Sequence, residues 1–441
     1  MEPRPEIESR PISISSYGYL LRSNANFRRL WLAQIVSEIG DWFYTLAIYN
    51  LLLTLTGRAS SVGLALVLQV LPQTFVGPVA GVVNDRISRR QVMIVADLVR
   101  AVIVISMLLV RTRSMVWLVY PLLLAETVMA AFFEPARSSV IPNITRREDL
   151  VVANTLSSMT WSMNLVLGST IGGVVAAFLG RDAVFVLNAL SFLVSAFLIR
   201  SMRFLEPHAE GHGRLQAREL VDFSPVMEGV RYVRRNGRLL STVLVKAGNL
   251  VIGPSWVLFT VMGQRTFPLH WQGIDSERGA MLGMSLLLGA RGIGALLGPL
   301  FSAPWAGHSQ KKLQLGVLLG YLVCGLGYVV MAQAKMVAIA CLFVALAHFG
   351  ASTVWVFSTT LLQMNTEDRF RGRVFAAELG FFMLTIALGA FLCGAFLDAG
   401  ASPRTVGTIA GLLMILPAAL WARAVRSWKS EKSGALLTEV D

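Results

Sequence analysis

Charged side chains are scarce in this sequence. Asp, Glu, Lys and Arg make up 15% of the 441 residues, whereas an average soluble domain has about 25%. Cysteine is almost absent: the three that occur, Cys324, Cys341 and Cys393, lie inside long apolar stretches. No two of them have the spacing of metal ligands, and thiols buried in helices behave as small hydrophobic groups. The sequence therefore gives no support to a disulfide framework and argues against an ordinary soluble protein.

Motifs of catalysis are missing as well. The chain has no Gly-x-x-x-x-Gly-Lys-Ser/Thr phosphate loop, no Gly-x-Ser-x-Gly nucleophile turn and no zinc-binding His/Glu spacing. The glycine-rich run 289–298 lies inside an apolar stretch, where it favours close helix packing over a phosphate site. We therefore expect no enzyme activity, no catalytic residue, no metal and no cofactor.

What the sequence does have is long apolar runs, since hydrophobic residues make up 55% of it. A helix crosses the hydrocarbon core of a bilayer in about 20 residues. Twelve runs reach about that length, at 29–56, 60–83, 91–110, 115–140, 150–178, 182–202, 239–262, 279–305, 313–334, 337–363, 373–398 and 404–424. The predicted fold class is an all-α membrane protein with twelve transmembrane helices.

The positions of Lys and Arg predict the orientation. With the N-terminus in the cytoplasm, the cytoplasmic segments carry 28 of these residues and the opposite side carries 8. Such a bias places both termini in the cytoplasm, and an odd number of spans would destroy it. It also accounts for the net charge of +13 without a nucleic-acid partner. The first 25 or so residues are polar, so we expect no cleaved signal peptide and a multi-pass protein of the bacterial inner membrane.

The two halves of the chain resemble one another. Gly77-Pro78 in the second run has a counterpart in Gly298-Pro299 in the eighth, an offset typical of a duplicated six-plus-six bundle. The predicted organisation is a cytoplasmic tail, a six-helix bundle, a cytoplasmic linker, a second six-helix bundle and a second tail, at residues 1–28, 29–203, 204–238, 239–426 and 427–441.

The linker contains a predicted amphipathic helix. Ser224 and Pro225 suit a helix start, and Gly237 suits a helix end. Valines recur at helical spacing on the face opposite three arginines, namely Val226, Val230 and Val233 against Arg231, Arg234 and Arg235. We expect this helix to lie on the cytoplasmic face of the membrane. A plain linker between two bundles is the alternative.

The loop between the second and third runs carries a recognisable pattern. It reads Gly81-Val82-Val83-Asn84-Asp85-Arg86-Ile87-Ser88-Arg89-Arg90. This resembles the loop signature of the major facilitator superfamily. The signature has a second glycine at the position of Ser88. The resemblance implies a transporter with two pseudo-repeat bundles around a central cavity. It also implies a gating loop formed by Gly81, Asp85, Arg86, Arg89 and Arg90.

Physical chemistry gives this loop a role. Gly77 and Gly81 stand one helical turn apart and would let a neighbouring helix approach closely. Asp85 would face the N-terminus of the eleventh span, near Gly372, where a negative charge is favoured. The arginines would pair with acidic groups or lipid phosphates. A generic excess of cytoplasmic positive charge is the alternative reading.

Further elements narrow the resemblance. Gly168-Ser169-Thr170-Ile171-Gly172-Gly173 is similar to a helix-packing element of drug/proton antiporters, with Ser169 in place of its proline. Gly168, Gly172 and Gly173 would thin this helix so that the two halves can pack closely. Together with Gly40-Asp41 and the segment Arg371–Val374, the pattern resembles the bacterial branch that contains macrolide-efflux, enterobactin-export and lysophospholipid-transport proteins. These proteins carry different cargo, so the resemblance does not name a substrate.

Ionisable residues inside the spans are the candidate coupling groups, because charge in a bilayer is costly and usually functional. The resemblance implies that the first, fourth, seventh and tenth spans line the cavity. Asp41 lies about 17 Å into the first span at 1.5 Å per residue, with Glu38 one turn earlier and Glu126 at similar depth in the fourth. Desolvation favours the neutral form of a carboxylate, so Asp41, then Glu38, then Glu126 are the predicted proton-coupling residues. A structural hydrogen bond for Asp41 is the alternative.

Other polar residues lie inside the predicted spans, and their roles are interpreted from their spacing and depth. Asp97 and Arg100 are spaced i, i+3 and are interpreted as a structural pair. Lys246 is either a charge partner for Asp41 or an anchor near the cytoplasmic interface. His348 is either a packed polar residue or a proton relay. Arg291 lies deep in the eighth span.

Aromatic residues on the cavity-lining spans could stack on a bulky apolar cargo. Trp42, Trp256 and Trp355 lie deep enough for this, although tryptophan also anchors helices at the membrane interface. The predicted substrate cavity comprises Trp42, Lys246, Trp256, His348 and Trp355.

The favoured function is secondary active transport by alternating access: proton-coupled efflux of a hydrophobic or amphipathic small molecule, such as a drug or siderophore. Lysophospholipid translocation without proton antiport is the alternative. A membrane sensor is disfavoured, because the chain has no sizeable soluble domain through which to signal. The expected partners are the small-molecule substrate, protons and membrane lipid, and we expect a monomer.

Overall fold

The computed structural model describes residues 14–206, 224–269, 275–307, 309–366 and 368–438. Throughout these ranges the chain forms helices and short connections, without a β-strand. In parts of α6, α8, α14 and α16 and at a few other positions only the backbone is described. The predicted all-helical fold class is confirmed for this part of the chain.

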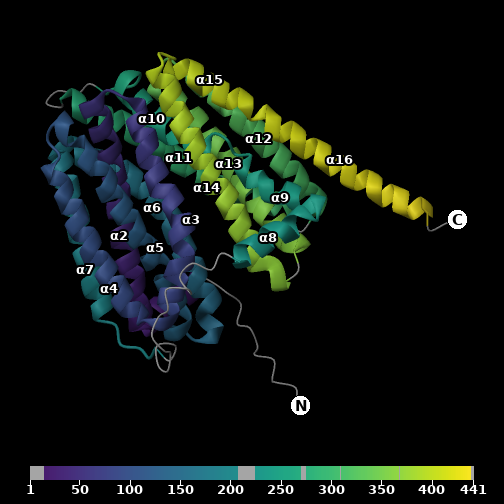
Figure 1. Ribbon diagram of the computed structural model, residues 1–441, viewed down its shortest axis with the longest axis horizontal. Coiled ribbons are helices and arrows are strands. Elements are labelled where there is room, and N and C mark those ends of the chain that lie inside the picture. The colour runs from purple at the N-terminus through teal and green to yellow at the C-terminus, as the bar shows by residue number, and fades with distance from the viewer. Residues whose placement is uncertain (1–13, 207–223, 270–274, 308, 367, 439–441) are drawn as a thin grey trace.

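The first bundle follows a short helix, α1, that lies within the predicted tail. Its long helices alternate in direction and pack with α2 against α6 and α7, and with α5 between α3 and α4 (Figure 1). The helices are α1 (Ile14–Ser23), α2 (Ala25–Thr56), α3 (Ala59–Arg86), α4 (Arg89–Ser106), α5 (Val119–Ile144), α6 (Leu150–Leu179) and α7 (Arg181–Arg200). Three short 3₁₀ turns connect them, at Met107–Leu109, Arg113–Leu118 and Arg147–Asp149.

The second bundle repeats this arrangement, with α11, α12 and α13 packed together and α14 against α10. Its helices are α8 (Ser224–Arg234), α9 (Gly237–Ala247), α10 (Ile252–Arg265), α11 (Ser276–Ala306), α12 (Gln310–Gln333), α13 (Val337–Asn365), α14 (Asp368–Asp398), α15 (Pro403–Leu413) and α16 (Ile415–Thr438).

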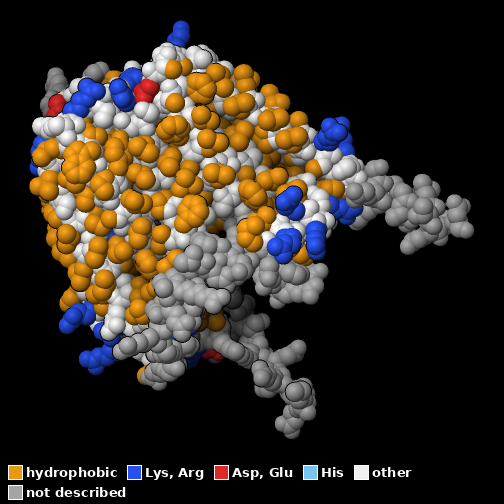
Figure 2. All heavy atoms as spheres, viewed as in Figure 1, with side chains coloured by type: hydrophobic (Ala, Val, Ile, Leu, Met, Phe, Trp, Pro, Cys, Tyr) orange, Lys and Arg blue, Asp and Glu red, His pale blue; other side chains and the backbone are white. Residues whose placement is uncertain are grey.

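The outside of both bundles is apolar. Ten segments of the described chain are long and apolar enough to cross a membrane, and orange hydrophobic side chains cover the face seen in Figure 2. Large exposed residues such as Val102, Phe197, Leu300 and Leu342 would be unfavourable in water but suit lipid. The protein is therefore a multi-pass membrane protein. Helices α2 and α6 are not among the ten segments, so the count of twelve stays a prediction.

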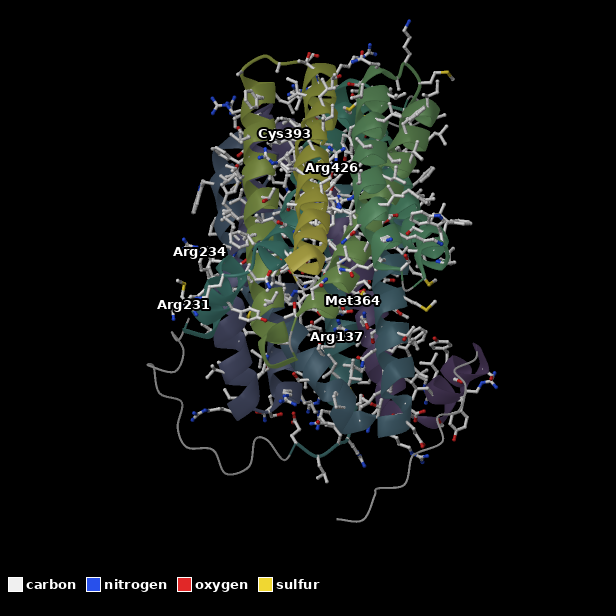
Figure 3. The ribbon with its side chains drawn as sticks, turned by 90° about the vertical axis from the view of Figure 1, so that its right-hand side faces the viewer. Arg137, Arg231, Arg234, Met364, Cys393 and Arg426 are labelled. Atoms are coloured by element: carbon white, nitrogen blue, oxygen red, sulfur yellow. The ribbon has the colours of Figure 1, made fainter. Side chains whose placement is uncertain are left out.

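The predicted amphipathic helix is present as α8. Val233 is buried against Leu239, Val243 and Val374, so its apolar face packs on α9 and α14 of the second bundle. Arg231 and Arg234 are exposed on its outer face (Figure 3).

Two helix boundaries differ from the sequence-based prediction. Gly237 does not end α8 but begins α9, because the Asn236 side chain accepts hydrogen bonds from the backbone N–H groups of Arg238 and Leu239, both at 3.1 Å. The seventh predicted span, 239–262, is two helices, with a break between Ala247 and Ile252.

The last predicted span is also divided, at Met414. Its second part, α16, continues as helix to Thr438 and so includes most of the predicted tail 427–441.

In the described structure, the contacts between the bundles run from the level of Trp42 and Trp256 to one end of the molecule. We call the end with Arg86 and Arg238 the basic end, and the end with Thr56 and Arg265 the opposite end. At the opposite end α3 and α14 are in close contact: a Cβ atom placed on Gly63 would lie 2.7 Å from the carbonyl oxygen of Ala390.

Toward the basic end, a Cβ atom on Gly77, Gly81 or Gly380 would meet no atom within 4 Å. The close helix approach predicted at Gly77 and Gly81 is therefore not made in this conformation, in which α3 and α14 diverge toward the basic end.

Candidate functional site

A charged cluster lies in the middle of the first bundle, with Arg100 of α4 at its centre. Its Nη2 atom is 2.8 Å from Oδ2 of Asp41 on α2 and 2.8 Å from Oε1 of Glu126 on α5. Its Nε donates to the same Glu126 oxygen at 2.9 Å. Asp97, one turn earlier on α4, is 3.9 Å away. The two short contacts of Arg100 are thus with Asp41 and Glu126. The predicted pair with Asp97 is the longest of its three contacts with carboxylates.

Packing holds this guanidinium in place. Arg100 is only 5% exposed, and its guanidinium lies over the Phe192 ring of α7 at 4.1 Å. One positive group therefore faces three carboxylates in a low-dielectric setting, where surplus negative charge is costly. Binding a proton at one carboxylate would relieve that surplus.

Asp41 is the accessible member of the cluster. Its side chain is 32% exposed, whereas Arg100 and Glu126 are buried. Its second oxygen, Oδ1, is buried and accepts no hydrogen bond in the described structure. An oxygen without a donor is a place where a carboxyl proton can reside without displacing an existing contact.

Glu38 lies one helical turn before Asp41 and is held differently. Its two oxygens accept hydrogen bonds from the side-chain amides of Gln34 and of Asn164 on α6, both at 2.8 Å. Neutral donors on both oxygens fix this carboxylate, but no cation neutralises it by a direct ion pair within the described residues.

The residue after Asp41 reaches the other bundle. The Trp42 ring stacks on the Trp256 ring of α10, with centroids 5.7 Å apart and planes 12° from parallel. Tyr49 meets Trp256 edge-on at 6.2 Å. On α11, the Arg291 guanidinium lies 4.1 Å from the Trp256 centroid. The sequence pointed to Trp42 and Trp256 separately, but neither their contact nor the places of Tyr49 and Arg291 in this group.

Glycines of α6 make room for these side chains. A Cβ atom on Gly168 would lie 2.7 Å from the Cβ of Trp42, and one on Gly172 would lie 2.8 Å from the Phe43 ring. At Gly173 it would collide with Ser285 of α11, in the other bundle. The three predicted packing glycines thus lie where α6 meets α2 and α11.

Polar contacts join the bundles between this site and the opposite end. Gln264 of α10 donates to Oδ1 of Asn50 at 2.7 Å and to Oγ1 of Thr54 at 3.0 Å. Arg181 and Glu277 form an ion pair at 3.3 Å. These contacts close the path from Trp42 toward the opposite end.

The second bundle contains a separate ion pair. Lys246 of α9 lies 2.8 Å from Oε2 of Glu378 on α14, and both side chains are buried. The ammonium also lies 4.2 Å from the centroid of Trp355, which packs edge-on against Phe382. The partner of Lys246 is therefore Glu378, not Asp41.

His348 does not lie on a cavity surface. It is buried within the second bundle, 3.0 Å from the hydroxyl of Tyr328 and packed against Phe259. Of the five predicted cavity residues, Trp42 and Trp256 are brought together, Lys246 and Trp355 form a second group, and His348 belongs to the bundle interior.

The predicted gating loop is held by its own bundle. Arg89 donates to the carbonyl oxygens of Asn84 and Ser139, at 3.2 and 3.0 Å. The backbone N–H of Arg90 donates to Glu206 at 3.3 Å. The side chains of Asp85 and of residues 368–373 lie outside the described part, so the expected contact of Asp85 with the start of α14 stays a prediction.

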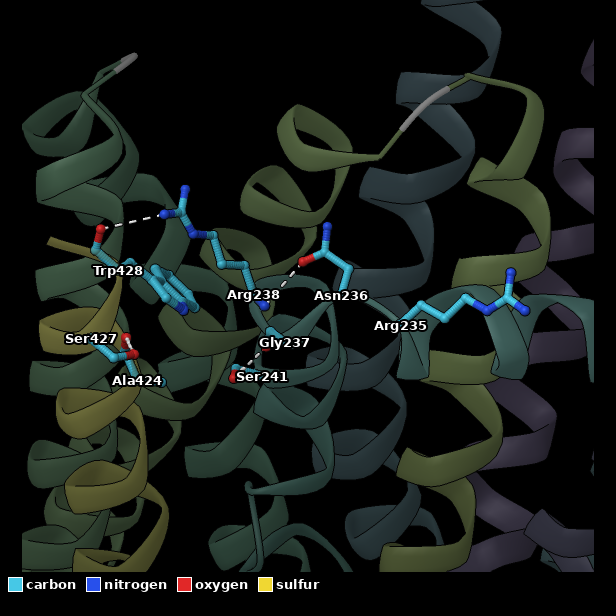
Figure 4. A pocket seen from close by; sticks show the side chains of 8 residues that line it. All are labelled: Arg235, Asn236, Gly237, Arg238, Ser241, Ala424, Ser427 and Trp428. Atoms are coloured by element: carbon cyan, nitrogen blue, oxygen red, sulfur yellow. Dashed lines mark hydrogen bonds between the residues drawn. The ribbon is translucent and has the colours of Figure 1, made fainter. Parts of the chain in front are cut away.

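A groove of about 540 Å³ opens at the basic end between the start of α9 and α16 (Figure 4). Arg238 crosses it to the carbonyl oxygen of Trp428, at 3.4 Å. Its lining includes none of the predicted cargo or coupling residues: it consists of Arg235, Asn236, Gly237, Arg238, Ser241, Ala424, Ser427 and Trp428. The groove is thus separate from the Trp42–Trp256 site.

Comparisons with known proteins agree with this architecture. A family model described as a transmembrane secretion effector matches residues 16–438. The chain is 27% identical to the uncharacterised MFS-type transporter YkuC of Bacillus subtilis over 314 residues, 69% of this chain and 71% of the relative. It is 23% identical to macrolide efflux protein A of Streptococcus pyogenes over 376 residues, 84% and 89% of the two chains. The crystal structure of the nucleoside transporter NupG has the same fold, with a TM-score of 0.69 at 12% identity, over 91% of this chain and 99% of the other.

Proposed function

This chain belongs to the transmembrane secretion effector family of the major facilitator superfamily, and on that premise we propose that it exports a hydrophobic or amphipathic small molecule in exchange for protons. It is a transporter rather than an enzyme. The similarity to a macrolide efflux protein over most of both chains supports outward transport. Drugs and siderophores are the cargo classes that we favour.

The proposed topology has twelve transmembrane helices and both termini in the cytoplasm of a bacterial inner membrane. Helices α2 and α6 supply the two spans beyond the ten apolar segments, since they are 32 and 30 residues long and lie inside the first bundle. The basic end is then cytoplasmic. With the opposite end closed, the conformation described here is open toward the cytoplasm.

The arrangement of Arg100 between Asp41 and Glu126 carries the proposal of proton coupling. When Asp41 binds a proton, its charge attraction to Arg100 is lost and Glu126 alone holds the guanidinium. Helix α2 then gains freedom relative to α4. Because Trp42 follows Asp41 on α2 and touches the other bundle, proton binding and cargo binding would both act on the same contact between the bundles.

The test is transport into liposomes that contain a trapped pH-sensitive dye. A proton gradient is imposed, and lipophilic drugs, a catecholate siderophore and lysophospholipids are added in turn. We expect proton flux that depends on cargo in the wild type and is lost in Asp41→Asn. Glu148→Gln is the control, since Glu148 is exposed and pairs only with Arg146 in the described structure.

Two results would contradict the proposal. Cargo movement without proton flux would leave transport but remove antiport, and lysophospholipid translocation would then lead if those lipids are the cargo moved. Proton flux that survives in Asp41→Asn would show that the coupling group lies elsewhere.

A further inference from the structure

Arg291 is a cation inside the second bundle that has no acidic partner in the described structure. It lies fifteen residues after the start of α11, which is about 22 Å along the helix at 1.5 Å per residue. Its Nη1 atom is buried and makes no hydrogen bond. In contrast, Arg100, Arg181 and Lys246 each form an ion pair.

Aromatic rings position Arg291 without using its N–H groups. The guanidinium lies against Trp256, which in turn stacks on Trp42 and meets Tyr49 edge-on. A cation over an aromatic face is stabilised by the ring electrons. The planar guanidinium keeps its fork of donors, which matches the two oxygens of a carboxylate.

Four acids on the neighbouring helices already have cationic partners. Asp41 and Glu126 are held by Arg100, Glu277 pairs with Arg181, and Glu378 pairs with Lys246. A charge left without a partner inside a membrane protein is unfavourable and usually marks a substrate pathway. The partner of Arg291 is therefore expected to come from outside the chain.

We propose that Arg291 binds a carboxylate group of the exported molecule while an apolar or aromatic part of that molecule packs against Trp42 and Trp256. The cargo class is then an amphipathic organic acid or zwitterion. This inference rests on the proposed export function and specifies its substrate. Arg291 lies in the second bundle and Asp41 in the first, so cargo and proton occupy different residues that meet through the tryptophan pair.

The test compares three fluorescent probes with one fluorophore. Dansyl-phenylalanine carries a carboxylate, its methyl ester is neutral, and dansylcadaverine is a cation. Binding to the purified full-length protein is measured by energy transfer from tryptophan to the dansyl group. We expect the wild type to bind the acid about tenfold or more tightly than the ester, as for a charge-assisted bidentate contact.

Two variants and one control make the result specific. Arg291→Gln should lower affinity for the acid to that for the ester, while affinity for the ester is unchanged. Arg291→Lys should keep part of the preference, because it keeps the charge but not the fork of donors. Arg404→Gln, which removes an exposed charge at the start of α15, should behave like the wild type. Unchanged ester binding also reports that each variant is folded.

Equal binding of acid and ester by the wild type, or a preference for the acid that persists in Arg291→Gln, would overturn this assignment. Neither result concerns proton coupling, which the liposome assay measures separately as proton flux that depends on cargo and on Asp41. Conversely, an Arg291-dependent preference for the acid without any proton flux would support this binding site. It would contradict only the proposal of proton antiport.

Discussion

Trp42 of the first bundle and Trp256 of the second stack nearly parallel, with ring centroids 5.7 Å apart. Each ring also has a charged neighbour: Asp41 precedes Trp42 in the chain, and Arg291 lies over Trp256. A change of charge on either side is therefore adjacent to the contact that joins the bundles. The proposed sites of proton uptake and cargo recognition therefore lie within one connected group of side chains.

Removing one ring of this pair should weaken cargo binding. Aromatic pairs contribute about 0.5–1.5 kcal/mol beyond the burial of area, so Trp42→Ala should raise the apparent KM for an aromatic cargo by at least two- to tenfold. Trp42→Phe should keep much of the affinity. Transport kinetics in liposomes would measure both. Trp117→Ala is the control, since Trp117 is exposed in the turn before α5; an equal loss there would argue against stacking.

The pH dependence of cargo binding should identify which acid exchanges the proton. If a proton on Asp41 competes with cargo, the affinity of the wild type for a neutral cargo falls as the pH is lowered. Asp41→Asn should bind the same cargo with little dependence on pH. Glu38→Gln should retain the dependence, because Glu38 is held by the amides of Gln34 and Asn164. Equilibrium binding from pH 5 to 9 measures this, and a flat wild-type curve would contradict it.

The sequence was sufficient for features that depend on local composition. Apolar runs of about twenty residues predicted the long helices, and the alternation of Val233 with Arg231 and Arg234 predicted α8. A helix that faces lipid is apolar on its outer side as well as its inner side, so an unbroken apolar run is enough to predict a membrane-spanning helix. The boundary at Gly237 was wrong because Asn236 offered a helix cap, and a glycine near such a cap is compatible with either role.

Contacts between distant residues could not be predicted in the same way. Lys246 and Glu378 are 132 positions apart, and no spacing within a helix could pair them. Arg100 stands three residues after Asp97, yet its shorter contacts are to Asp41 and Glu126 on other helices. Side-chain spacing within a helix shows which residues share a face, but the packing of α2, α4 and α5 decides which partner is nearer.

The ion pair between Lys246 and Glu378 should matter for stability. Both groups are buried, so Lys246→Met leaves a carboxylate without its partner, which typically costs about 3–5 kcal/mol. The double variant Lys246→Met/Glu378→Leu should recover most of the lost stability. Thermal unfolding in detergent of both single variants and the double variant measures the coupling between the two residues. Additive losses would show that the two side chains do not interact.

Substitution of two glycines on helix α3 should disfavour different conformations of the transporter. A side chain at Gly63 would collide with the backbone of α14 at Ala390, whereas one at Gly77 meets open space. Forcing a side chain into a packed contact costs about 1–3 kcal/mol, so Gly63→Val should lower the melting temperature of the form described here. Gly77→Val should leave it nearly unchanged.

Transport should nevertheless fall in Gly77→Val. Alternating access requires the basic end to close when the opposite end opens, and Gly77 would then approach the second bundle as Gly63 does now. Gly18→Val is the matched control, since a side chain at Gly18 of α1 also meets open space. Transport rates and melting temperatures of the three variants separate the cases. Normal transport by Gly77→Val would mean that α3 and α14 never come together at this level.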